Sequence, residues 1–231
     1  MRVAFIIDGF NLYHSIRDAE KQVSARPQRW LNLRTFCEDY VRHFGPTAVL
    51  SGVFYFSALA KHLEAAKPDI VRRHQSYIEA IEATGVDVTL ASFKSSEKFI
   101  PFKYCEFRLW PIRRRIRLPI PRWGVVVRRT EEKETDVAIA SKMFELLHTS
   151  VADAIVLVSG DTDLLPAIRM AKSLFPGAEV AVIFPFKRHN AELKRVVRRS
   201  FKVRREQYAR HQLPDPIVLP NGHQIRKPQT W

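Results

Sequence analysis

The sequence is poor in cysteine and glycine and has no long apolar run. The two cysteines, Cys37 and Cys105, are too few for a disulfide framework or a dedicated zinc site. Glycine occurs 8 times in 231 residues, and no phosphate-binding glycine loop of the nucleotide-binding type is present. No apolar stretch approaches the roughly 20 residues of a membrane span, and the N-terminus reaches Asp8 too soon for a signal peptide. We therefore expect a reduced, cytoplasmic protein with no membrane partner.

Acidic residues are outnumbered by basic ones. There are 38 Lys and Arg residues against 24 Asp and Glu residues, which gives a net charge of +14. A field of this sign attracts polyanions and raises their association rates, although a soluble basic protein without such a role is the ordinary alternative. Because no low-complexity tail carries the charge, we favour a nucleic acid as the partner.

Continuous apolar runs predict strands that are buried on both faces. Residues 3–7 and 154–158 show no polar alternation, which is typical of a parallel sheet covered by helices. Further strands are expected at 48–57 and 179–184, and a short strand at 86–90 suits a sheet edge. Strands that alternate with helical patterns predict an α/β fold with a central parallel sheet flanked by helices.

Helical spacing of apolar residues fills the segments between these strands. Asn11 is suited to cap the first helix, and a helix that begins at Glu131 is expected to run to about His148. The other helices are expected at 34–44, at 61–84 with a break or start at Pro68, at 164–175, and from Asn190 onward.

Residues 92–129 have a different character from the rest of the chain. Prolines interrupt them, and arginines alternate with apolar residues in 112–120 and 123–129, which predicts a basic β-ribbon. Arginine can contact phosphate, and an aromatic ring can stack on an unpaired base. The ordinary alternative is a solvated edge hairpin whose charges prevent association between sheets. We treat this segment as an insertion in a domain of residues 1–210, followed by an irregular tail at 211–231.

Basic residues of two regions are candidates for nucleic-acid binding. They are Arg113, Arg114, Arg115, Arg117, Arg128 and Arg129 in the insertion, and Lys187, Arg188, Lys194 and Arg198 toward the C-terminus. A protein partner or a second copy of the chain remains an alternative for the insertion.

Carboxylates follow the buried strands. Asp8 comes directly after the first strand, and Asp161 and Asp163 follow the strand at 154–158. Ligands of open α/β sheets bind at the carboxyl ends of the strands. A helix cap at Thr162 or Asp163 would explain one acid but not both. Asp136 lies in the first turn of a helix, where an acid meets the helix dipole, and we expect it on the buried face.

Four carboxylates that converge without partners would repel one another and raise their pKa values. A divalent cation would relieve that repulsion. Ligand sets made only of oxygen suit Mg²⁺ or Mn²⁺ rather than zinc. A bound cation can generate hydroxide from water and stabilise a leaving oxygen, and in a strongly basic protein the expected substrate is a nucleic-acid backbone.

Three motifs resemble the NYN domain family of the PIN-like nuclease superfamily. They are Asp8-Gly-Phe-Asn11, Glu132-Lys-Glu-Thr-Asp136-Val and Ser159-Gly-Asp161-Thr-Asp163, and the resemblance covers about residues 1–203. It implies a Rossmann-like sheet with an acidic metal site at its carboxyl edge, and Mg²⁺- or Mn²⁺-dependent endonuclease activity, usually on RNA. By this resemblance Asp8, Asp136 and Asp161 are metal ligands. Asp163 completes the site directly or through water, and Asn11 orients water or phosphate.

One position departs from the family pattern. Ser141-Lys142 stands where many relatives carry a further acid. This departure favours an alternative function, a non-catalytic nucleic-acid-binding or regulatory module with the same fold, whose binding would depend on salt but not on metal. A third reading is a phosphatase or nucleotide hydrolase for small phosphates, which a closed pocket would favour. DNA in place of RNA, and a homodimer, also remain open.

Overall fold

The computed structural model describes residues 1–22, 27–101, 104–109, 114–119 and 124–231. At its centre is a seven-stranded sheet in the order β6-β3-β2-β1-β7-β8-β9. Six neighbouring strands are parallel, and β6 pairs with β3 in the antiparallel sense. The strands are β1 (Arg2–Asp8), β2 (Val49–Ala58), β3 (Asp87–Pro101), β6 (Gly124–Lys133), β7 (Ala154–Val158), β8 (Glu179–Phe184) and β9 (Arg199–Lys202). The predicted α/β fold with a central parallel sheet is confirmed.

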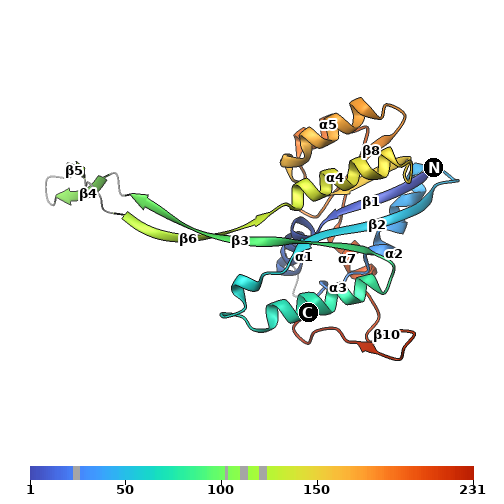
Figure 1. Cartoon of the computed structure of the whole chain (residues 1–231), viewed down its shortest axis with the longest axis horizontal. Coiled ribbons are helices and arrows are strands. Elements are labelled where there is room, and N and C mark those ends of the chain that lie inside the picture. Colours follow the sequence, from blue (N-terminus) through green and yellow to red (C-terminus); the bar gives the residue numbers. More distant parts are fainter. Residues whose placement is uncertain (23–26, 102–103, 110–113, 120–123) are drawn as a thin grey trace.

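Helices cover both faces of this sheet (Figure 1). The helices are α1 (Gly9–Gln22), α2 (Leu33–Val41), α3 (Asp69–Glu82), α4 (Thr135–His148), α5 (Leu165–Leu174), α6 (Ala191–Val196) and α7 (Arg205–Arg210). In β1, Val3, Phe5 and Ile7 pack into the core formed with α1, α2, α3 and α7. Ala4 and Ile6 point the other way, into the core formed with α4, α5 and α6. Burial on both faces explains the unbroken apolar run of this strand.

The insertion forms a long arm that extends away from the sheet (Figure 1). Beyond Ala91, β3 leaves β2 and pairs with β6 from Ser92↔Lys133 to Pro101↔Gly124. At the far end, β4 (Tyr104–Leu109) pairs with β5 (Arg114–Pro119). An antiparallel ribbon is present as predicted, but its strand pairing differs. The predicted strands at 112–120 and 123–129 correspond to β5 and β6, which pair with β4 and β3 rather than with one another. The strand expected at 86–90 is therefore longer than predicted, and β6 rather than β3 forms the edge of the sheet.

The start of α4 also differs from the prediction. Residues 131–133 belong to β6, and the helix begins at Thr135 after Glu134, whose φ is 82°. The buried side chains of α4 are Thr135, Ile139, Met143, Leu146 and Leu147. Asp136 is exposed and Val137 is 69% exposed, so the predicted buried face was wrong. Apolar residues occupy most sides of this helix, so that more than one face fits the pattern.

The C-terminal residues lie on the helical face formed by α1, α2 and α3. Leu213 and Ile225 are buried in that core. The ring of Trp231 lies 5.5 Å from that of Tyr77 and 6.5 Å from that of Trp30, measured between centroids. A short hairpin of β10 (Ile217–Val218) and β11 (Gln224–Ile225) precedes it. In the described residues, no helix has the length and apolar character needed to cross a membrane.

Candidate active site at the carboxyl edge of the sheet

Asp8 ends β1 and is buried, with 6% of its surface exposed. Its Oδ1 accepts a hydrogen bond from Asn11 N at 2.9 Å, and its Oδ2 accepts one from Ser159 Oγ at 2.9 Å. Asp8 therefore caps α1, and the prediction that Asn11 caps this helix was wrong. Asp and Asn are equally good caps, and the two residues lie only three positions apart.

A chain of hydrogen bonds joins the first turn of α1 to the loop after β7. Asn11 Oδ1 accepts from Gly160 N at 3.1 Å, and Ser159 Oγ accepts from Asp161 N at 3.0 Å. Asp161 Oδ1 accepts from Asp163 N at 3.0 Å and caps the short 3₁₀ turn Thr162–Leu164. The cap is thus Asp161, and neither Thr162 nor Asp163 caps this turn. These contacts fix both motifs relative to one another.

A pocket of about 490 Å³ opens at this edge of the sheet. The predicted acids Asp8, Asp136 and Asp161 line it together with Asn11. Its other lining residues are Phe10, His14, Glu134, Thr135, Val137 and Arg188. Asp163 is exposed and does not line this pocket. The structure therefore gathers three of the four predicted acids around one space, which we call the acid pocket.

The acids of the pocket disfavour one another's ionised forms. Burial is the largest cause of the raised pKa of Asp8, and the charges of Asp161 and Asp136 raise it further, against the hydrogen bonds from Asn11 and Ser159. The pKa of Asp136 is also raised, first by desolvation and then by Asp161 and Asp163. The pocket thus favours the uptake of a proton or a cation.

The donor set fits a hard divalent cation. Asp8, Asp136 and Asp161 offer only oxygen atoms, which Mg²⁺ and Mn²⁺ prefer, and a cation would offset their mutual repulsion. Across the part of the chain that the structure describes, however, no three His, Cys, Asp or Glu side chains form a group that could hold a metal ion. The metal site at Asp8, Asp136, Asp161 and Asp163 therefore stays a prediction.

Among the predicted basic residues whose side chains the structure describes, Arg188 is the one that lines the acid pocket. Its Nη2 donates to Asp18 Oδ2 at 2.7 Å. Its carbonyl oxygen lies so close to Gly160 that a Cβ on this residue would collide with it. Lys187, Lys194 and Arg198 are exposed and do not line this pocket. Three of the predicted arginines, Arg114, Arg115 and Arg117, belong to β5, and two more, Arg128 and Arg129, belong to β6. Arg113 lies outside the described residues.

Sequence reasoning missed three contributors to this site. Ser159 orients Asp8 and Asp161, Gly160 allows the close approach of Arg188, and His14 lines the pocket. The Ser-Gly pair between a buried strand and two acids was the available signal for the first two. Lys142 does not line the pocket, since its Nζ lies 2.7 Å from Glu145 and 5.3 Å from the centroid of the Phe54 ring.

The family model of the NYN domain matches residues 2–203. The chain belongs to the NYN domain family. This is a nuclease-type domain, and the six-stranded parallel sheet flanked by helices agrees with its PIN-like fold. The family predicted from the three motifs is thereby confirmed.

Two further proteins resemble this NYN domain. It is 22% identical over 264 residues to 6-hydroxy-3-succinoylpyridine 3-monooxygenase of Pseudomonas putida (strain DSM 28022 / S16), covering 100% of this chain and 75% of that protein. A crystal structure of a protein of unknown function from Vibrio parahaemolyticus RIMD 2210633 superposes with a TM-score of 0.51 at 12% identity. The match covers 88% of this chain and 93% of that one, and it shows a shared fold.

Proposed function

We propose that this NYN domain is a metal-dependent endoribonuclease that hydrolyses phosphodiester bonds of RNA at the acid pocket. The observation that carries the proposal is the meeting of Asp8, Asp136 and Asp161 around one pocket, with the pKa values of Asp8 and Asp136 raised. The nuclease-type family and the net charge of +14 favour a nucleic-acid substrate.

The four predicted acids, Asn11 and Arg188 each have a role in this proposal. Asp8, Asp136 and Asp161 would hold Mg²⁺ or Mn²⁺, and Asp163 would assist from the exposed side. When bound, the cation supplies an activated water and stabilises the charge on the leaving oxygen. Asn11 Oδ1 is engaged by Gly160 N, which leaves its Nδ2 to donate to a water or a phosphate oxygen. Arg188 lines the same pocket and would bind a phosphate.

The remaining cations would hold the RNA strand away from the reacting bond. Lys187, Lys194 and Arg198 are exposed, and Arg114, Arg115, Arg117, Arg128 and Arg129 belong to the arm. Contacts of this kind go to phosphates, so binding should weaken steeply as the salt concentration rises. DNA would share these contacts, and cleavage assays with both polymers separate the two substrates.

The test is cleavage of a labelled single-stranded RNA with Mg²⁺, with Mn²⁺ and with EDTA. Wild type should cut only when metal is present. Asp161→Asn should not cut, yet it should bind RNA as well as wild type or better because one negative charge is removed. Glu38→Gln is the matched control, since Glu38 is an exposed acid of α2 that pairs with Arg34 and lines neither this pocket nor its neighbour. Equal cutting by Asp161→Asn would contradict the proposal.

The same test distinguishes the nuclease from the alternative function, a non-catalytic RNA-binding module. Lys142, where many relatives carry an acid, is the residue that favours it. Salt-dependent RNA binding by both proteins, with no cutting by either and no effect of EDTA, would establish that function.

The name of the Pseudomonas putida relative supplies a second candidate function, action on a small substituted pyridine. The observation that favours a small aromatic ligand is a partly open pocket beside the acid pocket, whose lining includes Phe10, Tyr13, Tyr55, Tyr77 and Trp231. Consumption of 6-hydroxy-3-succinoylpyridine by the purified protein, supplied with oxygen and a two-electron reductant, would test this candidate.

A further inference from the structure

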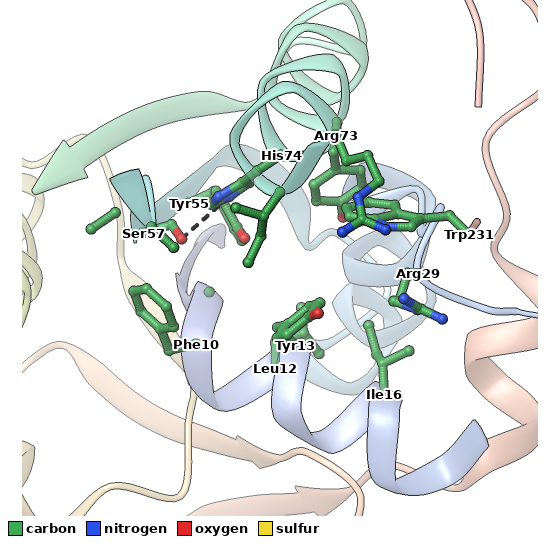
Figure 2. Close-up of a pocket in the computed structure, with 15 residues that line it drawn as sticks. Phe10, Leu12, Tyr13, Ile16, Arg29, Tyr55, Ser57, Arg73, His74 and Trp231 are labelled. Atoms are coloured by element: carbon green, nitrogen blue, oxygen red, sulfur yellow. Dashed lines mark hydrogen bonds between the residues drawn. The ribbon is translucent and has the colours of Figure 1, made fainter. Parts of the chain in front are cut away.

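A partly open pocket of about 100 Å³ lies between α1, α3 and the end of β2 (Figure 2). We call it the aromatic slot, and its walls include Phe10, Tyr13, Tyr55, Tyr77 and Trp231. A dry cavity of about 150 Å³ in another protein binds benzene. The aromatic slot is therefore comparable in size to a site for a single six-membered ring.

The two ends of the aromatic slot differ in chemistry. Figure 2 shows His74 and Ser57 at one end and Arg73, Arg29 and Trp231 at the other. His74 Nε2 and Ser57 Oγ are 3.4 Å apart. Burial lowers the pKa of His74 to about 4, so the imidazole is neutral at pH 7. This end offers a neutral group that can donate to, or accept from, a polar atom on a ring.

The other end carries excess positive charge. Arg73 Nε donates to Asp69 O at 3.2 Å, and its Nη1 donates to Thr230 Oγ1 at 2.7 Å, so both partners are neutral. No side-chain carboxylate lies within ion-pair distance of Arg73 among the residues the structure describes. Arg29 is paired with Glu20 at 3.1 Å. The guanidinium of Arg73 is therefore suited to receive an anionic group.

We infer that the aromatic slot binds one planar six-membered ring that carries an anionic group. The ring lies among the aromatic walls, its polar edge faces His74, and its anion contacts Arg73. A pyrimidine nucleotide of RNA and a free aromatic carboxylate share this chemistry. The inference rests on neither candidate function, although Phe10 lines both the aromatic slot and the acid pocket, so that a nucleotide held here would lie next to the acids.

The first test is calorimetric titration of the full chain, in EDTA, with uridine 5′-monophosphate and with pyridine-3-carboxylate. At least one of them should bind, and uridine and inorganic phosphate, which each carry half of the required chemistry, should bind at least about tenfold more weakly. Tighter binding of the nucleotide would identify RNA as the source, and tighter binding of the carboxylate would identify a free aromatic acid. Absence of binding by both ligands would overturn the inference.

Substitutions then locate the site. Arg73→Gln should weaken binding about tenfold. Arg72→Gln is the matched control and should leave binding within about twofold, because Arg72 pairs with Asp69 on the surface and does not line the aromatic slot. Ile70→Trp should abolish binding by filling the cavity. Binding as tight as that of wild type by the folded variants Arg73→Gln and Ile70→Trp would overturn the inference. Since EDTA removes metal, these results are independent of RNA cleavage.

Discussion

Two pockets flank the first turn of α1. Burial shifts the pKa values of their titratable side chains in opposite directions. In the acid pocket burial raises the pKa of Asp8 and favours the uptake of a proton or a cation. In the aromatic slot burial lowers the pKa of His74 and keeps the imidazole neutral. One helical turn thus separates a site suited to a cation from a site suited to a ring with an anion.

Both pockets depend on the close packing of that turn. A Cβ atom on Gly9 would lie 2.6 Å from Phe56 O and 2.6 Å from the ring of Tyr55. The absence of a side chain at Gly9 therefore lets Tyr55 approach the helix start while Asp8 remains at the acid pocket. The comparison predicts that each pocket can be damaged without the other.

The largest expected effect comes from Asp8→Asn. This change should reduce RNA cleavage by about a thousandfold, which corresponds to about 4 kcal/mol of transition-state stabilisation. The fold should persist because the Asn amide oxygen can still accept from Asn11 N and its NH₂ can donate to Ser159 Oγ. Ligand binding in the aromatic slot should be unchanged. Parallel loss of cleavage and of binding, measured on the same preparation, would show that the two pockets are not separate.

The second effect is a pH dependence of stability that originates in the aromatic slot. The pKa of His74 is about 4 in the folded chain, below the ordinary value of 6.5, so the unfolded chain takes up the proton first. His74 therefore contributes stability that is present above pH 6.5 and is lost as the pH falls toward 4, about 3 kcal/mol in all.

Urea unfolding of wild type and His74→Gln between pH 7 and pH 4 measures this contribution. Wild type should lose about 3 kcal/mol more than the variant over that interval. Identical losses in the two proteins would mean that His74 is not held neutral by burial.

The smallest effect concerns the loop that brings the two nuclease motifs together. Gly160→Ala should destabilise the fold by about 1–3 kcal/mol, because its Cβ would meet Arg188 O. Gly177→Ala is the control and should change the free energy of unfolding by no more than about 0.5 kcal/mol, because a Cβ there meets nothing within 4 Å. Thermal melts of the two variants measure this difference. Equal melting temperatures of Gly160→Ala and Gly177→Ala would refute the close approach of Arg188 O to Gly160.

The interior strands and the position of the acids could be predicted from the sequence. Residues 154–158 and 179–184 became β7 and β8 with the predicted bounds, because strands covered on both faces have continuous apolar sequences. The same parallel arrangement placed Asp8 and Asp161 at one edge of the sheet. For these residues the local sequence pattern alone indicates both the strand and its place in the interior of the sheet.

The length of β3 and the aromatic slot could not be predicted, because no local sequence pattern indicates them. In the arm, apolar side chains of both described strands are exposed, such as Phe99 of β3 and Val126 of β6, so no buried face marks these strands in the sequence. The aromatic slot is assembled from Phe10, His74 and Trp231, which are far apart in sequence. No spacing rule connects such residues before the fold is known.

The central claim is that the acid pocket is a metal-dependent catalytic centre. Its most direct test is to titrate Mn²⁺ into EDTA-treated wild type and Asp161→Asn, and to follow the cleavage of one labelled single-stranded RNA. We expect cutting that rises and saturates with Mn²⁺ for wild type and stays at background for Asp161→Asn. Cutting that ignores Mn²⁺, or that is equal in the two proteins, would contradict it.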